Sequence, residues 1–542
     1  MQQHYEEYTE SQRRLLDRFV TNTNSNVFVL RNLPEVIKGA LFSRYSRSTL
    51  GLRSLLLREF IQNDETAFQA ILGSLPSENA EEQVLAIRKA QNFYDRILDG
   101  YGDDSIGELG GAHLAMENIS MLAAKSVEDV RLGGSPLEKS TRYIYFDQKV
   151  HDQYLFYREP VLMTSAYRNL YVDTCDMLFD TYSRLIPELT EVLQERYPRE
   201  AEVSKVAYTS ALRAKVLDCL RGLLPASTLT NVGVFGNGRF FEHLLQKLQA
   251  ESLAEMQELG RRSYEELSMV IPSFVRRADP NHRHFQAFAK FAETMKGDLL
   301  AAAQIFEEVA EPMKKPGVRL IQWDEHGPQR VAGALLFPFG EAGLQELDHY
   351  MERIPDEDLA RILEAAASAR ENRRHKSPRA LEHSHFTFEI IADFGCYRDL
   401  QRHRVLTQDR QLLGCRYGYQ VPAELVGLPM EEEYCRALEK AQQVWELIAG
   451  DLPEEAQYVV PMAFNVHWYF HIDLRALQWL CELRSQPQGH PNYRLIAQQM
   501  ARSVAEVQPQ FERFFKFVDF DGYEMGRFQQ EVRRVARTQG KA

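Results

Sequence analysis

The stretch "RHRVLTQDRQLLGCRY", residues 402–417, carries four arginines and a histidine. A second stretch, "EDVRLGGSPLEKSTRY", residues 128–143, ends in the same Arg-Tyr pair but lacks the Arg-His-Arg triplet. Subtracting 142 from 416 at the paired arginines gives an offset of 274, and the same offset takes Glu108 to Glu382. These matches suggest that the two stretches are copies of one segment.

Two further matches follow in the same order in both halves of the chain. Pro225 and Pro461 differ by 236, and the same offset takes "NGR" at 237–239 to "DLR" at 473–475. Ordered matches at two places in each half are the sequence signature of an internal repeat. We therefore predict a duplicated chain, with repeat 1 in the N-terminal half and repeat 2 in the C-terminal half.

The composition narrows the class of protein. The 542 residues carry a formal net charge of −13, which argues against stable binding of nucleic acid but allows a local basic pocket. The six cysteines form no CxxC pair and no zinc spacing, so we predict reduced thiols and no metal site. A polar N-terminus and the lack of an apolar run of about 20 residues predict a cytoplasmic chain without a membrane span.

Local patterns give a coarse domain plan. "KKPG" at 314–317 indicates a boundary, and "VRLIQW" at 318–323 and "HFTFEIIADF" at 385–394 indicate strands. The stretch "AHLAMENISMLAAKSVEDV" at 112–130 is typical of a helix. We predict an N-terminal helical extension over 1–25, repeat 1 over 26–313 and repeat 2 over 314–542.

The second half resembles the flavin-dependent thymidylate synthases. That family carries Arg-His-Arg, an Arg-Tyr pair beyond it, and Glu-His about twenty residues before it; here these are residues 402–404, 416–417 and 382–383. It also carries a proline, then Asn-x-Arg and Leu-Arg, which resemble Pro461, residues 473–475 and residues 483–484. The likeness covers about 160 residues of repeat 2 and is weaker in repeat 1.

The resemblance implies an α+β fold of two tandem domains, each a small mixed or antiparallel sheet with several long helices. It also implies FAD as cofactor, NADPH as reductant, methylenetetrahydrofolate as one-carbon donor, and a dUMP-like nucleotide as substrate, methylated at C5. The family assembles as a homotetramer, which a duplicated chain would mimic as a homodimer.

The same resemblance assigns roles to residues. It implies catalytic roles for Arg402 and Arg484. The implied substrate-binding residues are Glu138, Ser140, Arg142, Arg221, Asp399 and Arg416. The implied cofactor-binding residues are Ser105, Glu108, Asn237, Arg239, Glu382, His383, Arg402, His403, Arg404, Asp473 and Arg475. Arginine suits such roles because its planar fork binds phosphate oxygens in a bidentate manner.

The two repeats lack different parts of the family pattern. Repeat 1 keeps the Glu-x-Ser-x-Arg phosphate loop at 138–142 but has Glu-Asp-Val in place of the triplet. Repeat 2 keeps the triplet but has Leu412 and Gly414 where the loop would have Glu and Ser. We therefore predict a composite site, with repeat 1 binding the nucleotide phosphate and repeat 2 binding the base and the flavin.

Other functions remain open at this point. The missing motif parts also fit a non-catalytic nucleotide-binding or flavin-binding relative, or a flavin-dependent methyltransferase for another uracil-containing substrate. Asp399 replaces a glutamine of the family near the nucleotide, and a carboxylate there is unfavourable unless an arginine pairs with it. An RNA-binding role is disfavoured, because the chain is acidic and lacks interleaved aromatic and basic tracts.

Overall fold

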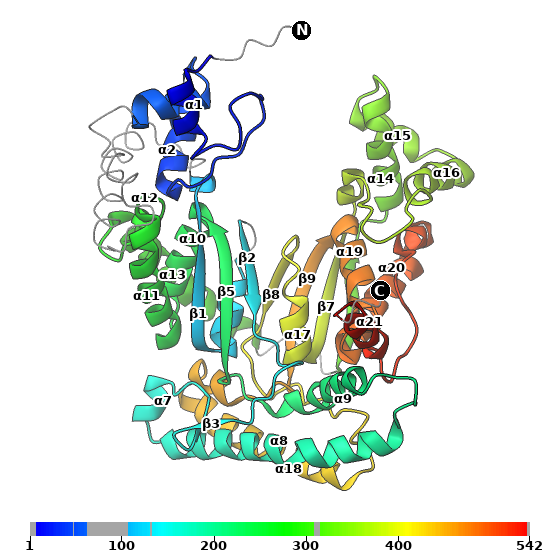
Figure 1. Cartoon of the computed structure of the whole chain (residues 1–542). Helices are drawn as coiled ribbons and strands as arrows, with labels where there is room; N and C mark the ends of the chain where they lie inside the picture. Colours follow the sequence, from blue (N-terminus) through cyan, green and yellow to red (C-terminus); the bar gives the residue numbers. More distant parts are fainter. Residues whose placement is uncertain (1–6, 47, 62–106, 131–132, 308–314, 539–542) are drawn as a thin grey trace. The chain divides into compact units, whose positions relative to one another are not determined.

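The computed structural model describes residues 7–46, 48–61, 107–130, 133–307 and 315–538 (Figure 1). The predicted site residue Ser105 and the predicted boundary near 314 lie outside these ranges. The chain forms two compact units. Unit 1 contains residues 1–117, 130–138 and 231–310, and unit 2 contains residues 118–129, 139–230 and 311–542.

Unit 1 is built around a three-stranded sheet with the order β1-β5-β2. Its strands are β1 (Gly111–Ser120), β2 (Gly134–Glu138) and β5 (Leu229–Asn237), with the last residues of β1 and the first residues of β5 counted in unit 2. The helices that follow β5 are α10 (Gly238–Ala250), α11 (Ala254–Val270), α12 (Pro272–Val275), η5 (Arg276–Ala278) and α13 (Arg283–Glu307). At the N-terminal end lie α1 (Glu10–Leu16), α2 (Glu35–Tyr45), α3 (Leu52–Leu55) and η1 (Leu56–Ile61).

Close packing in unit 1 depends on glycines beside Phe240, on the first turn of α10. Strand β2 pairs with β5 so that Gly134 lies opposite Gly236. A Cβ atom at either glycine would lie 2.3 Å from the Phe240 ring, so only glycine fits at both positions.

Unit 2 contains an antiparallel sheet with the order β6-β7-β9-β8. Its strands are β6 (Gly317–Trp323), β7 (His385–Asp393), β8 (Thr407–Arg410) and β9 (Asn465–Asp473), which confirms both predicted strands. Phe386, Phe388 and Ile390 alternate with polar residues along β7 and are fully buried. On the polar face, His467 contacts Glu389 across the strand pair at 2.9 Å.

The helices of unit 2 come from both repeats. Repeat 1 contributes α6 (Met121–Glu128), α7 (Pro160–Thr164), α8 (Arg168–Arg196), α9 (Lys205–Leu220) and η4 (Arg221–Leu223), with the short strands β3 (Lys149–Val150) and β4 (Gln153–Tyr154). Repeat 2 contributes α14 (Gly327–Leu336), η6 (Phe337–Phe339), α15 (Leu344–Met351), α16 (Asp356–Ala367), η7 (Arg379–His383), α17 (Phe394–Leu400), α18 (Pro429–Asp451), η8 (Glu455–Val459), α19 (Leu474–Arg484), α20 (Pro491–Val507), η9 (Pro509–Phe515) and α21 (Phe528–Thr538). No helix in the described ranges is both long and apolar enough to cross a membrane.

The two repeats join through an antiparallel backbone bridge between Pro225 and Pro461, inside unit 2. Its four backbone hydrogen bonds form two matched pairs. In the first pair, Ala226 N donates to Val460 O (2.9 Å) and Met462 N donates to Leu224 O (2.9 Å). In the second pair, Ser227 N donates to Tyr458 O (3.0 Å) and Ala463 N donates to Gly222 O (2.9 Å). Each matched pair relates residues at the predicted offset of 236. The junction therefore has local two-fold symmetry, which confirms the duplication.

The strand-to-helix junctions repeat as well. The Asn237 side chain caps α10 as the Asp473 side chain caps α19. Likewise, Ser120 caps α6 and Asp393 caps α17, and these two residues are 273 positions apart. Because the Arg-Tyr pairs are 274 positions apart, the segment from the cap to the Arg-Tyr pair is one residue longer in repeat 2.

The helix predicted over 112–130 is wrong in its first half, where the chain forms β1 before α6 begins at Met121. Alanine, leucine, methionine and glutamate favour helix locally, but pairing with β5 overrides that preference. The cap at Ser120 marks the true start of the helix.

Gly222 tests the repeat junction. A Cβ atom there would lie 2.1 Å from the Tyr434 hydroxyl, in a buried environment. We expect Gly222→Ala to lower the free energy of unfolding by about 1–3 kcal/mol, because a packed interior resists added volume. The measurement is the urea denaturation midpoint.

The matched control is Gly450→Ala in the exposed part of α18, where an added Cβ meets nothing within 4 Å. This change should raise the free energy of unfolding by about 0.5–1 kcal/mol. Equal midpoints for the two variants would contradict the tight junction.

Candidate functional site

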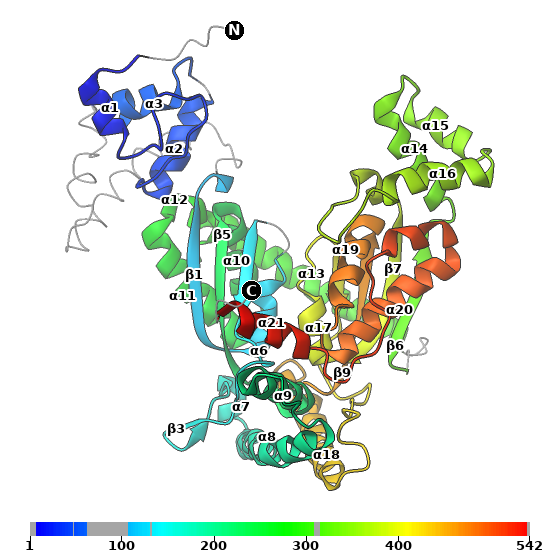
Figure 2. The ribbon, with the colours of Figure 1, turned by 45° about the vertical axis from the view of Figure 1, so that its right-hand side comes forward.

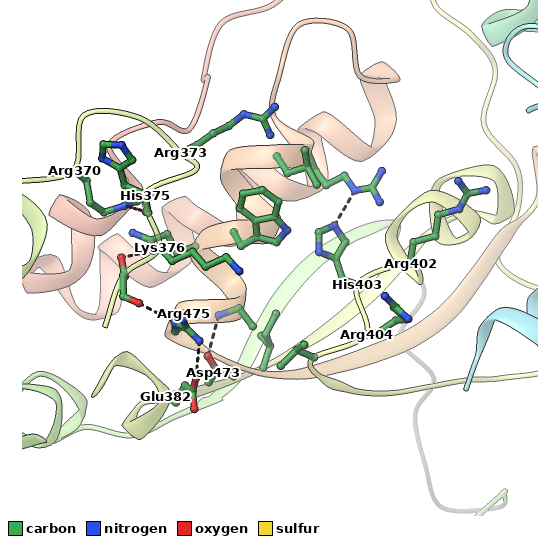
Figure 3. A pocket seen from close by; sticks show the side chains of 18 residues that line it. Arg370, Arg373, His375, Lys376, Glu382, Arg402, His403, Arg404, Asp473 and Arg475 are labelled. Carbon is green, nitrogen blue, oxygen red and sulfur yellow. Dashed lines mark hydrogen bonds and ion pairs between the residues drawn. The ribbon is translucent and has the colours of Figure 1, made fainter. Parts of the chain in front are cut away.

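A cavity of about 460 Å³ lies within unit 2 (Figure 3). Its walls come from the segment after α17, the end of β9, helix α19, and the segment before η7 together with η7 itself. Seven predicted residues line it: Glu382, Arg402, His403, Arg404, Asp473, Arg475 and Arg484. Figure 3 shows the Arg-His-Arg triplet on one side, with Lys376, Glu382 and Arg475 on the other.

The Glu382 side is fixed by ion pairs. Arg475 Nη1 lies 2.9 Å from Glu382 Oε1, and Arg475 Nε donates to the Ser377 carbonyl at 2.8 Å. Hydrogen bonds from Arg379, followed by those from Arg475, lower the pKa of Glu382, so this group is a carboxylate at neutral pH. Arg475 is thereby held in the cavity wall.

The triplet side contains a histidine held neutral. Arg484 Nε donates to His403 Nε2 at 2.8 Å, so His403 accepts at this nitrogen and carries its proton on Nδ1. Burial, with a contribution from Arg484, lowers the pKa of His403 well below its usual value. A neutral imidazole therefore orients Arg484.

Cations outnumber carboxylates in this cavity. Seven cationic residues line it (Arg370, Arg373, Lys376, Arg402, Arg404, Arg475 and Arg484), against Glu382 and Asp473. Arg370 is neutralised by a buried pair with Glu482, at 2.7 Å. Trp479 also lines the wall with 41% of its surface exposed, which gives a flat aromatic face. Such a lining suits an anionic ligand with a planar ring system.

The predicted phosphate-loop arginine of repeat 1 is buried and bound to a carboxylate. Arg142 contacts Asp218 through Nε and Nη2, at 2.7 and 2.8 Å, and its Nη1 donates to the Tyr493 hydroxyl at 3.0 Å. Burial opposes the charged form of Asp218, but Arg142 and Arg527 hold its pKa well below the usual range. The Arg142–Asp218 pair is therefore fully ionised.

Arg221, the second phosphate arginine of repeat 1, pairs with Asp399 of repeat 2. Both terminal nitrogens of Arg221 lie 3.3 Å from Asp399 Oδ2. Despite burial, Arg221 and then Arg142 hold the pKa of Asp399 well below its usual value. Gly395 makes room for this contact, since a Cβ there would lie 3.1 Å from Arg221 Nη2. Arg221 is the arginine partner that a carboxylate at 399 requires.

The predicted residues of the two repeats meet within unit 2. Two guanidiniums approach the Tyr493 ring, that of Arg142 at 5.5 Å and that of Arg484 at 5.4 Å from its centroid. Arg402 lies 3.8 Å from the buried carboxylate of Glu128, at the end of α6. The structure thus places repeat 1 and repeat 2 side chains at one locus.

The remaining predicted residues that the structure describes do not line the cavity. In unit 1, Arg239 pairs with Glu108 at 2.7 Å, Asn237 caps α10, and Glu138 is buried at the end of β2. In unit 2, Ser140 accepts from the Arg142 backbone N–H at 3.2 Å, His383 is exposed outside the cavity lining, and Arg416 lies over the Trp445 ring at 5.5 Å. Their binding roles stay predictions.

Sequence reasoning missed several residues at this locus: Asp218, Trp479, His490, Tyr493 and Arg527. None belongs to a motif shared by the repeats, so comparison of the two halves had no signal for them. A buried arginine needs a carboxylate partner, and this need was the one signal that could have pointed to a residue such as Asp218.

Comparison with known proteins identifies relatives along most of the chain. The family model described as "Thymidylate synthase complementing protein" matches residues 56–273 and 319–510. A UPF0159 protein of Chlamydia muridarum is 54% identical over 98% of this chain and 99% of its own length. A UPF0159 protein of Thermoplasma acidophilum is 34% identical over 93% of this chain and 99% of its own length.

Among solved structures, a UMP/dUMP methylase of Streptomyces cacaoi, PolB, bound with 5-Br dUMP, is similar to part of the chain. It is 19% identical, with a TM-score of 0.30, over 39% of this chain and 98% of its own.

His490 gives the locus a pH dependence. Its Nδ1 accepts from Asn492 N at 3.2 Å, and its Nε2 lies 3.3 Å from the Asp218 carbonyl. Burial, then Arg221, lowers the pKa of His490 to about 3. The unfolded chain therefore binds one more proton than the folded chain between that value and about 6.5, and stability falls as the pH falls through this range.

We expect His490→Asn, which keeps a capping side chain on α20, to remove this contribution. Between pH ~6 and ~4, the native chain should lose about 1.4 kcal/mol per pH unit more than the variant. Urea denaturation at several pH values measures the slopes. His151→Asn, at an exposed left-handed position that asparagine tolerates, should keep the native slope. Identical slopes in all three proteins would refute the buried neutral histidine.

Proposed function

We propose that this chain, which belongs to the thymidylate synthase complementing protein family, is a flavin-dependent enzyme that methylates a uracil nucleotide such as dUMP at C5. The observation that carries the proposal is the cationic cavity of unit 2, built from the Arg-His-Arg triplet, Glu382, Arg475 and Arg484. When bound, reduced FAD supplies the hydride, methylenetetrahydrofolate supplies the carbon, and NADPH regenerates the flavin.

The cavity fits a flavin dinucleotide in three respects. Its volume of about 460 Å³ lies in the usual range of cofactor sites. Lys376, Arg404 and Arg475 surround it with cations suited to a diphosphate. Trp479 offers an exposed aromatic face for a ring system. We therefore assign FAD to this cavity.

The substrate base is assigned to the side of the cavity near Arg402 and Arg484. A positioned guanidinium would stabilise the negative charge that develops on a uracil carbonyl oxygen when C5 is activated as the nucleophile that takes up the one-carbon unit. The neutral His403 holds Arg484 by accepting from Nε, which leaves the terminal nitrogens of Arg484 available as donors. His403 is a positioning residue in this scheme.

The nucleotide phosphate is assigned to Ser140, Arg142 and Arg221 of repeat 1. Arg142 reaches Tyr493, and Arg221 reaches Asp399, so both meet repeat 2 side chains. Each repeat would then supply the part that the other lacks. A homodimer of such chains would match the four subunits of the related enzymes.

The carboxylates of Asp218 and Asp399 favour a second candidate function. Both phosphate arginines pair with carboxylates of the chain itself, which would suit a different uracil-containing substrate or a flavoprotein without catalysis. Formation of dTMP from dUMP, methylenetetrahydrofolate and NADPH by the purified chain separates these cases. A yellow protein that forms no dTMP would support the second candidate.

Flavin content tests the assigned cavity. We expect Arg475→Gln to weaken FAD binding by about 10-fold to 100-fold, because charge-assisted hydrogen bonds contribute about 1.5–3 kcal/mol. The measurement is the 450 nm absorbance per chain and the dissociation constant of added FAD.

Arg379→Gln is the matched control, because Arg379 also pairs with Glu382 but does not line the cavity. It should keep its flavin. Equal loss in both variants, or a colourless native chain that takes up no FAD, would refute the assignment.

A further inference from the structure

The C-terminal segment of the chain contributes an arginine to the phosphate locus. The family match ends at residue 510, and the described chain continues to 538. Helix α21 packs against α9, as Figure 2 shows. Arg527, directly before α21, is buried beside Asp218, which belongs to α9. No motif of the sequence analysis contains this arginine.

Arg527 is anchored by backbone oxygens and keeps one buried donor nitrogen that makes an ion pair but no hydrogen bond. Its Nη1 donates to the Arg142 carbonyl at 3.3 Å, and its Nε donates to the Gln488 carbonyl at 3.2 Å. Its Nη2 lies 3.6 Å from Asp218 Oδ1 and is buried without a hydrogen bond. A buried donor of this kind is costly unless a ligand or water satisfies it.

Asp218 therefore stands between two guanidiniums, with Arg142 at 2.7 Å and Arg527 at 3.6 Å from Oδ1. One carboxylate neutralises only one of the two positive charges. A phosphate dianion carries a second negative charge and additional acceptor oxygens, which could bind both arginines and accept a hydrogen bond from Arg527 Nη2. The cluster is thus better matched to a phosphate than to its own carboxylate.

Two cavities border Asp218 of this cluster. A volume of about 220 Å³ is lined by Asp218, Arg221 and His490 among others. A small volume of about 20 Å³ is lined by both Asp218 and Arg527. Asp218 borders both volumes, so it is the member of this cluster that a phosphate in the larger cavity would meet.

We infer that Arg527 is a nucleotide-binding residue that grips the phosphate together with Arg142, and that Asp218 occupies the place of the phosphate in the free protein. This inference rests on the proposed function and deepens it. Nucleotide binding exchanges one anion for another at the two guanidiniums. The C-terminal segment thereby becomes part of the substrate site.

The test is calorimetric titration of the FAD-loaded chain with dUMP and with deoxyuridine, which lacks the phosphate. Arg527→Gln should weaken dUMP binding by about tenfold or more and leave deoxyuridine binding unchanged. Arg533→Gln, on the exposed face of α21, should leave both unchanged. Equal effects of Arg527→Gln on the two ligands, or no effect on either, would overturn the inference.

A second variant tests whether the Asp218 carboxylate competes with the phosphate, and it leaves both arginines in place. Asp218→Asn should strengthen dUMP binding several-fold and leave deoxyuridine binding unchanged. Unchanged or weaker dUMP binding would overturn the role of Asp218. If the native chain binds FAD but neither uracil compound, the proposed substrate is wrong and this inference falls with it. If the native chain binds dUMP but the variants do not behave as expected, the inference about Arg527 and Asp218 is wrong and the proposed function stands.

Discussion

The backbone bridge between Pro225 and Pro461 is the constraint on which the site depends. Its paired hydrogen bonds fix repeat 1 against repeat 2 without any side chain, so the register tolerates divergence of the two copies. Arg221 begins the short helix just before this bridge, and Gly395 donates from its backbone to Met462 just beyond it. The bridge thus determines that Arg221 reaches Asp399 across the repeats.

Charge compensation explains the side chains around that bridge. A buried guanidinium without a partner costs about 3–5 kcal/mol, so Arg142 and Arg221 need carboxylate partners. Asp218 and Asp399 do so. In the cavity near Arg402, solvent can hydrate the cations, and the cationic residues outnumber the carboxylates. The arginines from repeat 1 are therefore buried and paired with carboxylates, whereas the cavity from repeat 2 is open to solvent.

Features that repeat or alternate locally could be predicted from the sequence. The residue pattern predicted strands β6 and β7, and the constant offsets between matched residues predicted the duplication. The spacing of the family motifs predicted the seven residues that line the cavity. β1 was misread because its residues favour helix and only pairing with β5 decides otherwise. Asp218, Tyr493 and Arg527 come together from α9, α20 and the segment before α21, and no local pattern encodes such contacts.

The central claim is that both repeats hold one nucleotide, and its most direct measurement is the dUMP dissociation constant of two single variants. Arg142→Gln removes a repeat 1 guanidinium, and Arg402→Gln removes one from repeat 2, on the other side of the locus. The account predicts that each change weakens dUMP binding by about tenfold or more. Native affinity in either variant would contradict a site composed of both repeats.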